Sequence, residues 1–212
     1  MIFTFKNTSF NSNTYLITNE FENECLIIDP GINYELADTF LDERQIKPIA
    51  IICTHGHFDH IASVSFFKEK YNIPFYIHEK DLRAIKSANF FIKIAKINFV
   101  IKTLIPDVIF KEENTTLNLG SFKINVSNFP GHSPGSCIIQ IDDNLFSGDI
   151  LYKKGLGFNQ FPDEDKALLK ESIKKISRYY VDKSIVYPGH GGSASLETIL
   201  NDNKELVEFL KE

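Results

Sequence analysis

The chain has 212 residues, of which 43% are hydrophobic and 24% are charged, and its formal net charge is −5. This composition excludes a disordered chain and is typical of a soluble globular protein, which we expect to be a single domain over residues 1–212. The acidic balance argues against the basic surface that a nucleic-acid partner requires, and no apolar run is long enough to cross a membrane.

The three cysteines, Cys25, Cys53 and Cys137, are widely spaced and lie in apolar stretches. An odd number in such positions is typical of buried free thiols in a reducing compartment. The first fifteen residues also lack the basic segment and apolar run of a secretory signal. We therefore predict a cytoplasmic protein that acts on a small molecule, and its oligomeric state is left open.

The first half of the chain contains short apolar runs closed by Gly, Pro, Asn or Asp, a pattern that predicts strands separated by turns. The expected elements are strands over 2–7, 13–18, 24–31 and 48–54 and helices over 34–45 and 61–71. Residues 48–54 are apolar on both faces. That pattern is typical of a strand in the middle of a covered sheet.

The second half begins with Lys, Ile and Phe at helical spacing over 82–105, which predicts one or two amphipathic helices beside the site. The further strands are expected over 108–112, 115–120, 122–129, 136–142, 144–149 and 184–189, and the further helices over 162–180 and 195–211. Pro162 suits the first turn of its helix. The expected buried residues of these two helices are Leu169, Ile173, Ile176 and Tyr180 in the first, and Leu196, Leu200, Val207 and Leu210 in the second.

Five of the six histidines and two aspartates stand where an apolar strand has just ended in a loop. These residues are His55, His57, Asp59, His60, His132, Asp149 and His190. Imidazole and carboxylate are ligands that Zn²⁺ favours, and Fe and Mn accept the same mixture. Glycines beside several of them allow the sharp turns that bring distant strand ends together. The seven residues therefore predict a site for about two divalent metal ions, with zinc preferred.

The histidines differ in how strongly each one indicates a metal site. A lone histidine after a strand, such as His190, is usually a solvated or capping residue. The run from His55 to His60 is different, because three imidazoles and a carboxylate so close together would repel one another unless a cation held them. His78 lacks a flanking glycine, so we interpret it as structural. Phe58 and Ile61 are expected to be core residues beneath the site.

The motifs THGHFDH, GHSPGS, SGDIL and YPGHG, in this order and at these spacings, resemble those of the metallo-β-lactamase superfamily and, within it, the glyoxalase II-like hydrolases. The resemblance covers nearly the whole chain. It implies an α/β fold, a four-layer αββα sandwich, with a dinuclear metal site along one edge. The implied ligands are His55, His57 and His132 for the first ion and Asp59, His60 and His190 for the second, with Asp149 bridging both.

The charge of such a site suits hydrolysis. Two divalent ions bring four positive charges, Asp59 and Asp149 remove two, and a bridging hydroxide removes a third, which leaves a site that favours a developing oxyanion. Metal ions lower the pKa of bound water from about 16 toward 7, so that hydroxide is available at neutral pH. We therefore expect metal-bound hydroxide to attack a thioester, with Asp59 and Asp149 as the catalytic carboxylates.

Other members of the superfamily suggest alternative reactions. Persulfide dioxygenases resemble the same motif set but use one iron held by two histidines and a carboxylate, which would make the chain an oxidoreductase. Lactone hydrolases share the ligands closely. True β-lactamases of this fold place a cysteine among the ligands of the second ion, and no cysteine lies in these loops.

One segment departs from the glyoxalase II-like pattern. Those enzymes commonly follow the bridging aspartate with G-C-G-K or G-I-G-R, whose basic residue lies near the substrate. Here the segment is ILYKKGLGF, in which Phe158 takes the basic position and Lys153 or Lys154 remains to reach the substrate. The separate C-terminal helical domain that helps bind glutathione is also not expected after His190. We therefore predict that glutathione thioesters are poor substrates.

Overall fold

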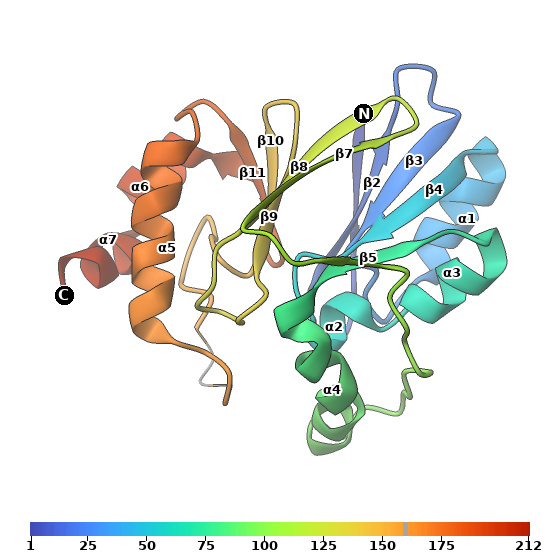
Figure 1. Ribbon diagram of the computed structural model, residues 1–212, viewed down its shortest axis with the longest axis horizontal. Coiled ribbons are helices and arrows are strands. Elements are labelled where there is room, and N and C mark those ends of the chain that lie inside the picture. The colour runs from blue at the N-terminus through green and yellow to red at the C-terminus, as the bar shows by residue number, and fades with distance from the viewer. Residues whose placement is uncertain (159–160) are drawn as a thin grey trace.

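Two six-stranded sheets face each other in the computed structural model, which describes residues 1–158 and 161–212. Helices cover the outer face of each sheet, so that the layers follow the order helix, sheet, sheet, helix (Figure 1). The α/β four-layer sandwich predicted from the motifs is therefore confirmed. None of the described helices is long and apolar enough to cross a membrane.

The first sheet has the strand order β1-β2-β3-β4-β5-β6. The strands are β1 (Ile2–Lys6), β2 (Asn13–Thr18), β3 (Glu24–Ile28), β4 (Lys47–Ile52), β5 (Phe75–His78) and β6 (Val108–Phe110). Strands β1 to β3 pair antiparallel, whereas β3 to β6 run parallel. The apolar strand predicted over 48–54 is β4, and it lies between two parallel neighbours as expected.

Helices α1 (Glu35–Arg44) and α3 (Val64–Tyr71) cover the outer face of this sheet (Figure 1). The helix predicted over 61–71 is divided, because the short helix α2 (Phe58–Ile61) ends before α3 begins. Of the amphipathic segment predicted over 82–105, only α4 (Leu82–Ile94) is helical, and it follows the short 3-10 helix η1 (Glu79–Asp81).

The second sheet has the order β12-β11-β10-β9-β8-β7. Its strands are β7 (Asn114–Leu119), β8 (Phe122–Asn128), β9 (Cys137–Ile141), β10 (Asn144–Gly148), β11 (Ile185–Pro188) and β12 (Ala194–Ser195). The chain runs antiparallel from β7 to β10, and β10 then pairs with β11 in parallel. Helices α5 (Lys166–Tyr179), α6 (Leu196–Asp202) and α7 (Lys204–Lys211) cover its outer face (Figure 1).

Alternating side chains build the layers. In β3, Ile27 packs toward α1 and α3, whereas Leu26 and Ile28 pack between the two sheets. In β9, Ile138 packs toward α5, and its neighbours Cys137 and Ile139 face the other sheet. Because successive side chains of a strand point to opposite faces of the sheet, they enter two different core layers alternately. All three cysteines are buried and free, as predicted.

Two helical predictions need correction. The helix predicted from Pro162 begins at Lys166, because the side chain of Asp165 accepts a hydrogen bond from the backbone N–H of Leu168 and caps the helix there. Its predicted buried residues, Leu169, Ile173, Ile176 and Tyr180, are all buried.

The C-terminal helix predicted over 195–211 is two helices, α6 and α7, separated at Asn203. The side-chain oxygen of Asn203 caps α7 by accepting from the backbone N–H of Leu206. The break changes the phase of the helix. As a result Leu200, Val207 and Leu210 are only half-buried, while Leu196, Ile199, Leu206 and Phe209 form the buried face.

Candidate metal centre

All seven predicted ligand residues converge at one edge of the sandwich. Strands β4, β8, β10 and β11 end at this edge, and each leads directly into a loop that carries at least one of the seven. The side chains form two groups whose ligand-type atoms lie within 4.8 Å of one another, and Asp149 lies between the groups. His78 lies outside both groups, and its Nδ1 accepts a hydrogen bond from the backbone N–H of Lys80.

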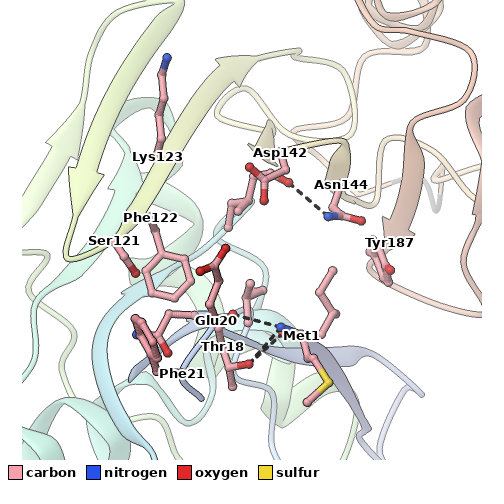
Figure 2. Close-up of a pocket in the computed structure, with 14 residues that line it drawn as sticks. Met1, Thr18, Glu20, Phe21, Ser121, Phe122, Lys123, Asp142, Asn144 and Tyr187 are labelled. Carbon is pink, nitrogen blue, oxygen red and sulfur yellow. Dashed lines mark hydrogen bonds between the residues drawn. The ribbon is translucent and has the colours of Figure 1, made fainter. Parts of the chain in front are cut away.

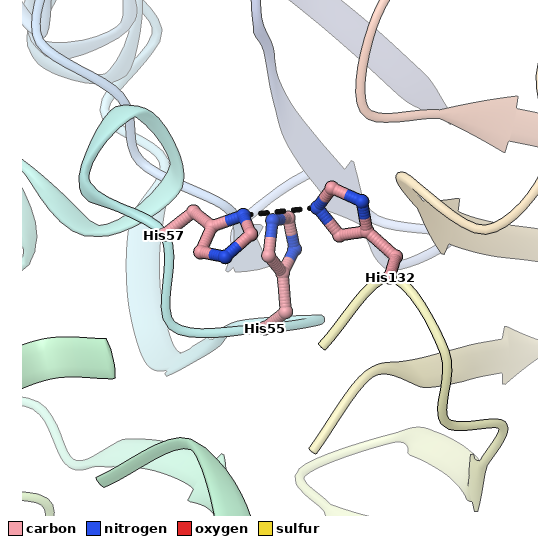
Figure 3. A group of neighbouring side chains, drawn as sticks. All are labelled: His55, His57 and His132. Atoms are coloured by element: carbon pink, nitrogen blue, oxygen red, sulfur yellow. Dashed lines mark hydrogen bonds between the residues drawn. The ribbon is translucent and has the colours of Figure 1, made fainter. Parts of the chain in front are cut away.

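The first group contains His55 and His57, from the loop after β4, and His132, from the loop after β8. All three residues are buried. Figure 3 shows their rings turned toward a common point, and Nδ1 of His57 lies 2.9 Å from Nε2 of His132. We call this group the first triad, and it joins loops from the two sheets.

The second group contains Asp59 and His60, from helix α2, and His190, from the loop after β11. Oδ2 of Asp59 lies 3.5 Å from Nε2 of His60 and 3.4 Å from Nε2 of His190. The side chain of His190 is 26% exposed, so this second triad is more open to solvent than the first.

Asp149 stands between the triads. Its Oδ2 lies 3.5 Å from Nε2 of His132, in the first triad, and 3.4 Å from Nε2 of His190, in the second. Its Oδ1 lies 3.5 Å from Nε2 of His60. A side chain at Gly189 would collide with this carboxylate, which explains why a glycine precedes His190.

The protein anchors the outer ring nitrogen of two histidines in the first triad. Nδ1 of His132 lies 2.8 Å from the carbonyl oxygen of Gly157, which can only accept, so Nδ1 carries the hydrogen. The hydroxyl of Thr54 donates to Asp29, so its oxygen accepts from Nδ1 of His55 at 3.0 Å. With Nδ1 as the donor, both rings turn Nε2 toward the centre of the triad.

The second triad is anchored in the same way. Nδ1 of His60 donates to Oδ2 of Asp29 at 3.1 Å, and Nδ1 of His190 donates to the carbonyl oxygen of Phe10 at 3.0 Å. The two Nε2 atoms then face each other at 3.3 Å. Two lone pairs at this distance repel unless a proton or a metal ion lies beside both. Ligands of one tetrahedral ion, with bonds of about 2.0–2.1 Å, stand about 3.3 Å apart.

Buried polar atoms without partners point to the same conclusion. Among the described residues, Nε2 of His55 and Oδ1 of Asp149 are buried and have no hydrogen-bond partner. Unsatisfied buried polar atoms are rare and costly, so each calls for an explanation. A cation between these atoms would satisfy them, and outer-nitrogen anchors of this kind are typical of metal-ligating histidines. The residues present therefore fit a metal centre.

The electrostatics of the two triads differ. Burial, followed by the neighbouring histidines, holds the pKa of His55 well below its ordinary value. Burial acts in the same direction on His60 and His190, but the carboxylates of Asp59 and Asp149 overcome it and raise the pKa of His60 to about 9 and that of His190 to about 10. In the first triad Asp149 likewise raises the pKa of His132 against its burial. Without a bound cation, protons are therefore favoured in the second triad and at His132 of the first.

Sequence reasoning missed Asp29, which lies near the end of the strand predicted over 24–31. The Asp29 carboxylate accepts from the backbone N–H of Thr54 at 2.7 Å, from the Thr54 hydroxyl at 2.6 Å and from His60. It thus orients His60 directly and His55 through Thr54. The signal in the sequence was an aspartate at the end of an apolar strand, the same position that identified the ligands.

Asp81 was missed as well. This residue of η1 is fully buried, and it accepts from the backbone N–H of Gly56 at 2.8 Å and of Gly135 at 2.6 Å. It also accepts from the hydroxyl of Ser133 at 2.7 Å. Gly56 lies between His55 and His57, and Ser133 follows His132. One carboxylate therefore holds together the two loops that form the first triad.

A cavity of about 380 Å³ opens onto the site, and four of its lining residues are aromatic: Phe10, Phe58, Tyr152 and Phe161. The ring of Phe161 lies 4.8 Å from that of His57, centroid to centroid, and the ring of Tyr152 lies 6.0 Å from that of His190. Phe58, which we expected only as a core residue, is buried and also lines this cavity, whereas Ile61 is a core residue.

The predicted substrate-loop residues lie elsewhere. Lys153 and Lys154 are exposed, and Phe158 packs against the core beneath α5, α6 and α7. These three residues are outside the lining of the cavity at the triads, and Tyr152 is the residue of this loop that lines it. The expectation that Lys153 or Lys154 reaches the substrate is therefore not supported by the lining of this cavity.

A larger cavity, of about 630 Å³, lies at the opposite ends of the strands, between the β2–β3 turn and the turns of the second sheet (Figure 2). Its lining includes Met1, Glu20, Phe122, Asp142 and Tyr187. Histidine and cysteine are absent from this lining, so it offers no imidazole or thiolate ligand. The chemistry of the chain is concentrated at the other end of the sandwich.

Comparisons with known proteins agree with this geometry. A family model described as the Metallo-beta-lactamase superfamily matches residues 7–190, a range that includes both triads and Asp149. The chain is 31% identical over 202 residues to the probable metallo-hydrolase YqgX of Bacillus subtilis (strain 168), and the alignment covers 93% of each protein. It is 29% identical over 193 residues to the hydroxyacylglutathione hydrolase GloC of Haemophilus influenzae, which covers 89% of this chain and 90% of that protein.

Among solved structures, the fold is similar to that of BLEG-1, which is described as a B3 metallo-beta-lactamase. The TM-score is 0.86 and the identity is 29%, and the superposition covers 97% of this chain and 99% of BLEG-1.

Proposed function

The chain belongs to the metallo-beta-lactamase superfamily and is related to metal-dependent hydrolases, and from this premise we propose that it hydrolyses thioesters at a dinuclear metal centre. One observation carries the proposal: at two adjacent points, anchored imidazoles turn their free nitrogens toward a common centre. The similarity to GloC, a hydroxyacylglutathione hydrolase by name, supports a thioester as the substrate.

In this proposal the first triad, His55, His57 and His132, holds one ion, and the second triad, Asp59, His60 and His190, holds the other. Asp149 contacts histidines of both triads, which supports its assignment as the bridge. The ligands are nitrogen and oxygen atoms, a set that suits Zn²⁺ and is also accepted by Fe and Mn.

Bound ions would supply Lewis acidity that activates water and polarises the substrate carbonyl. The protein contributes the rest. Asp59 and Asp149 reduce the positive charge of the centre, and Asp29 and the carbonyl of Phe10 fix the orientation of His60 and His190. The aromatic side chains that line the cavity provide apolar surroundings, which strengthen these electrostatic interactions.

Metal analysis combined with kinetics tests this function. We expect about two ions per chain, and we expect His57→Ala and His132→Ala to reduce thioester turnover by orders of magnitude without unfolding the protein. His78→Ala is the matched control, because His78 is a buried histidine outside both triads. Near-normal turnover in a preparation stripped of metal would refute the proposal.

The cavity also indicates which thioesters suit the site. Its lining is largely aromatic and contains no Lys or Arg. An uncharged, apolar acyl group therefore fits against Phe10, Phe58 and Phe161 better than a charged one. Because Phe158 stands at the basic position of glyoxalase II-like enzymes, we expect a high KM for S-lactoylglutathione. A low micromolar KM with rapid turnover would contradict this expectation.

Hydrolysis of a cyclic amide or ester is the second candidate. The observation in its favour is the similarity to BLEG-1, which is described as a metallo-beta-lactamase. A β-lactam and a lactone in the same substrate panel separate this candidate from thioester hydrolysis. A single iron per chain, together with oxygen consumption on a persulfide, would instead identify the oxidoreductase alternative.

A further inference from the structure

Two neighbouring cavities, which share Lys80 and which we together call the groove, lie beside the metal centre on the side of α4. The ring of Phe161 lies 4.8 Å from His57 and 5.3 Å from Phe91 of α4, centroid to centroid. Beyond these rings lies a cavity of about 450 Å³ whose lining includes Phe90, Phe91, Lys80 and Arg83. Asp163 also lines it, and its Oδ1 lies 3.8 Å from Nε2 of His57.

A second cavity continues the groove on the far side of Lys80. Its volume is about 360 Å³, and Lys80 belongs to the lining of both cavities. Lys175, Arg178 and Tyr179 of α5 line its other side. The side chain of Tyr179 is 61% exposed, so an aromatic surface is available to a ligand here.

The groove is the place where this acidic chain concentrates unpaired positive charge beside its metal centre. Its four cations, Lys80, Arg83, Lys175 and Arg178, form no ion pair within residues 1–158 and 161–212. The lining carboxylates are Asp163, which faces His57, and Glu113. Positive charge therefore exceeds negative charge along the groove, although the whole chain carries a net charge of −5.

We propose that this groove binds the thiol half of the substrate and that this half bears phosphate groups. The inference rests on the proposed thioester hydrolysis and names the leaving group. The small aromatic cavity at the triads holds the acyl group, the apolar stem of the thiol lies along Phe90 and Phe91, and its phosphates meet the four cations. Hydrolysis breaks the C–S bond, forms a C–O bond to water, and leaves a proton on the released thiol.

This assignment accounts for the altered loop after Asp149. A cation near the thiol half is expected in glyoxalase II-like enzymes, and here Phe158 replaces it. The structure places four cations on η1, α4 and α5 instead, outside the lining of the cavity at the triads. A leaving group that is longer and more highly charged than glutathione matches that spacing.

Two thioesters with the same acyl group test the proposal. One is the coenzyme A thioester, which bears phosphates, and the other is the N-acetylcysteamine thioester, which bears none. We expect a KM roughly tenfold lower for the first, the effect of about one charge-assisted contact, and we expect added salt to reduce the difference. The combined variants Lys80→Gln/Arg83→Gln and Lys175→Gln/Arg178→Gln should each reduce this preference.

Lys86→Gln/Lys93→Gln is the matched control, because both lysines are exposed on α4 and lie outside the groove. Calorimetric titration with coenzyme A itself measures binding to the groove without turnover. A failure of thioester hydrolysis is therefore distinguishable from a failure of this inference. Equal KM values for the two thioesters, or an equal effect of the control pair, would overturn the proposal. Tighter binding of single-stranded RNA than of coenzyme A would overturn it as well.

Discussion

The two triads lie at the same edge of the sandwich but differ in composition and in surroundings. The first consists of three buried histidines, and Asp81 joins its two loops. The second includes the carboxylate of Asp59, has a partly exposed histidine, and is oriented by Asp29 and a loop carbonyl. The first triad is therefore a closed site made of imidazoles alone, and the second is an open site that includes a carboxylate.

The difference indicates how the two ions should behave. An enclosed set of imidazoles holds its ion chiefly by geometry, whereas a site that contains a carboxylate also attracts its ion by charge. The second site is also the one that solvent reaches through His190. We therefore expect the two ions to respond differently to mutations outside the ligand set and to pH.

Removal of Asp149 should have the largest effect, because this carboxylate acts on both sites at once. Asp149→Ala takes away the one carboxylate that contacts histidines of both triads. We expect turnover to fall on the order of a thousandfold and the content of both ions to decrease. Elemental analysis that finds both ions at their normal content would contradict the bridging role.

Asp81→Asn should weaken the first site selectively. The side-chain amide of the asparagine would direct its own N–H groups toward the donors of Gly56, Ser133 or Gly135. Because two donors repel each other, the two loops would separate slightly. We expect the affinity for the first ion to fall by about 10- to 100-fold, with a smaller loss at the second. Titration with metal, followed by calorimetry, measures the two affinities separately. Equal losses at both sites would show that Asp81 supports the fold in general.

Asp29→Asn is the complementary variant, and we expect a smaller effect. Asp29 contacts His60 of the second triad directly and reaches His55 of the first through Thr54. The second ion should therefore lose affinity by roughly tenfold and the first by less. The same titration serves as the measurement, and the comparison fails if the Asp29 and Asp81 variants weaken the same site.

The smallest expected effect is the change in the stability of the metal-free protein with pH. In that state the pKa of His60 is raised to about 9 and that of His190 to about 10, chiefly by Asp59 and Asp149 acting against burial. These imidazolium groups stabilise the fold below their ordinary pKa of about 6.5, and the contribution is lost as the pH rises through 9 to 10. Calorimetry in the presence of chelator should show a Tm that decreases from pH 7 to pH 10. A Tm that rises over this range would exclude the proposed charge pairing.

Much of the fold was predictable because most of the strands are short apolar runs closed by a turn residue. The two-residue strand β12 (Ala194–Ser195) is an exception and was not predicted. Strand β4 was recognisable as central from its two apolar faces. The division of the C-terminal helix was not predictable, because Asn203 resembles an ordinary polar residue on the surface of a helix. Its cap to Leu206 and its bonds to the carbonyls of Tyr152 and Gly155 depend on tertiary contacts.

The candidate ligands were visible because each follows an apolar strand and most lie beside a glycine. The residues that orient them were less visible. Asp81 lies in a charged segment, and its partners Gly56 and Gly135 are 25 and 54 residues away in the chain. Such long-range hydrogen bonds leave no local pattern, so a sequence reading identifies the ligands before it identifies their supports.

The positions of the histidines in the chain have a consequence for stability. His57 and His132, which meet in the first triad, are 75 residues apart, and His60 and His190, which meet in the second, are 130 apart. Ions held there would act as reversible cross-links that close long loops and join the two sheets. In the chain-entropy description of disulfides, cross-links of this span reduce the conformational entropy of the unfolded chain. They thereby raise its free energy by roughly 4 kcal/mol or more. Metal supply would therefore determine how long the folded protein resists unfolding and proteolysis, in a molecule whose three cysteines are free and form no disulfide links.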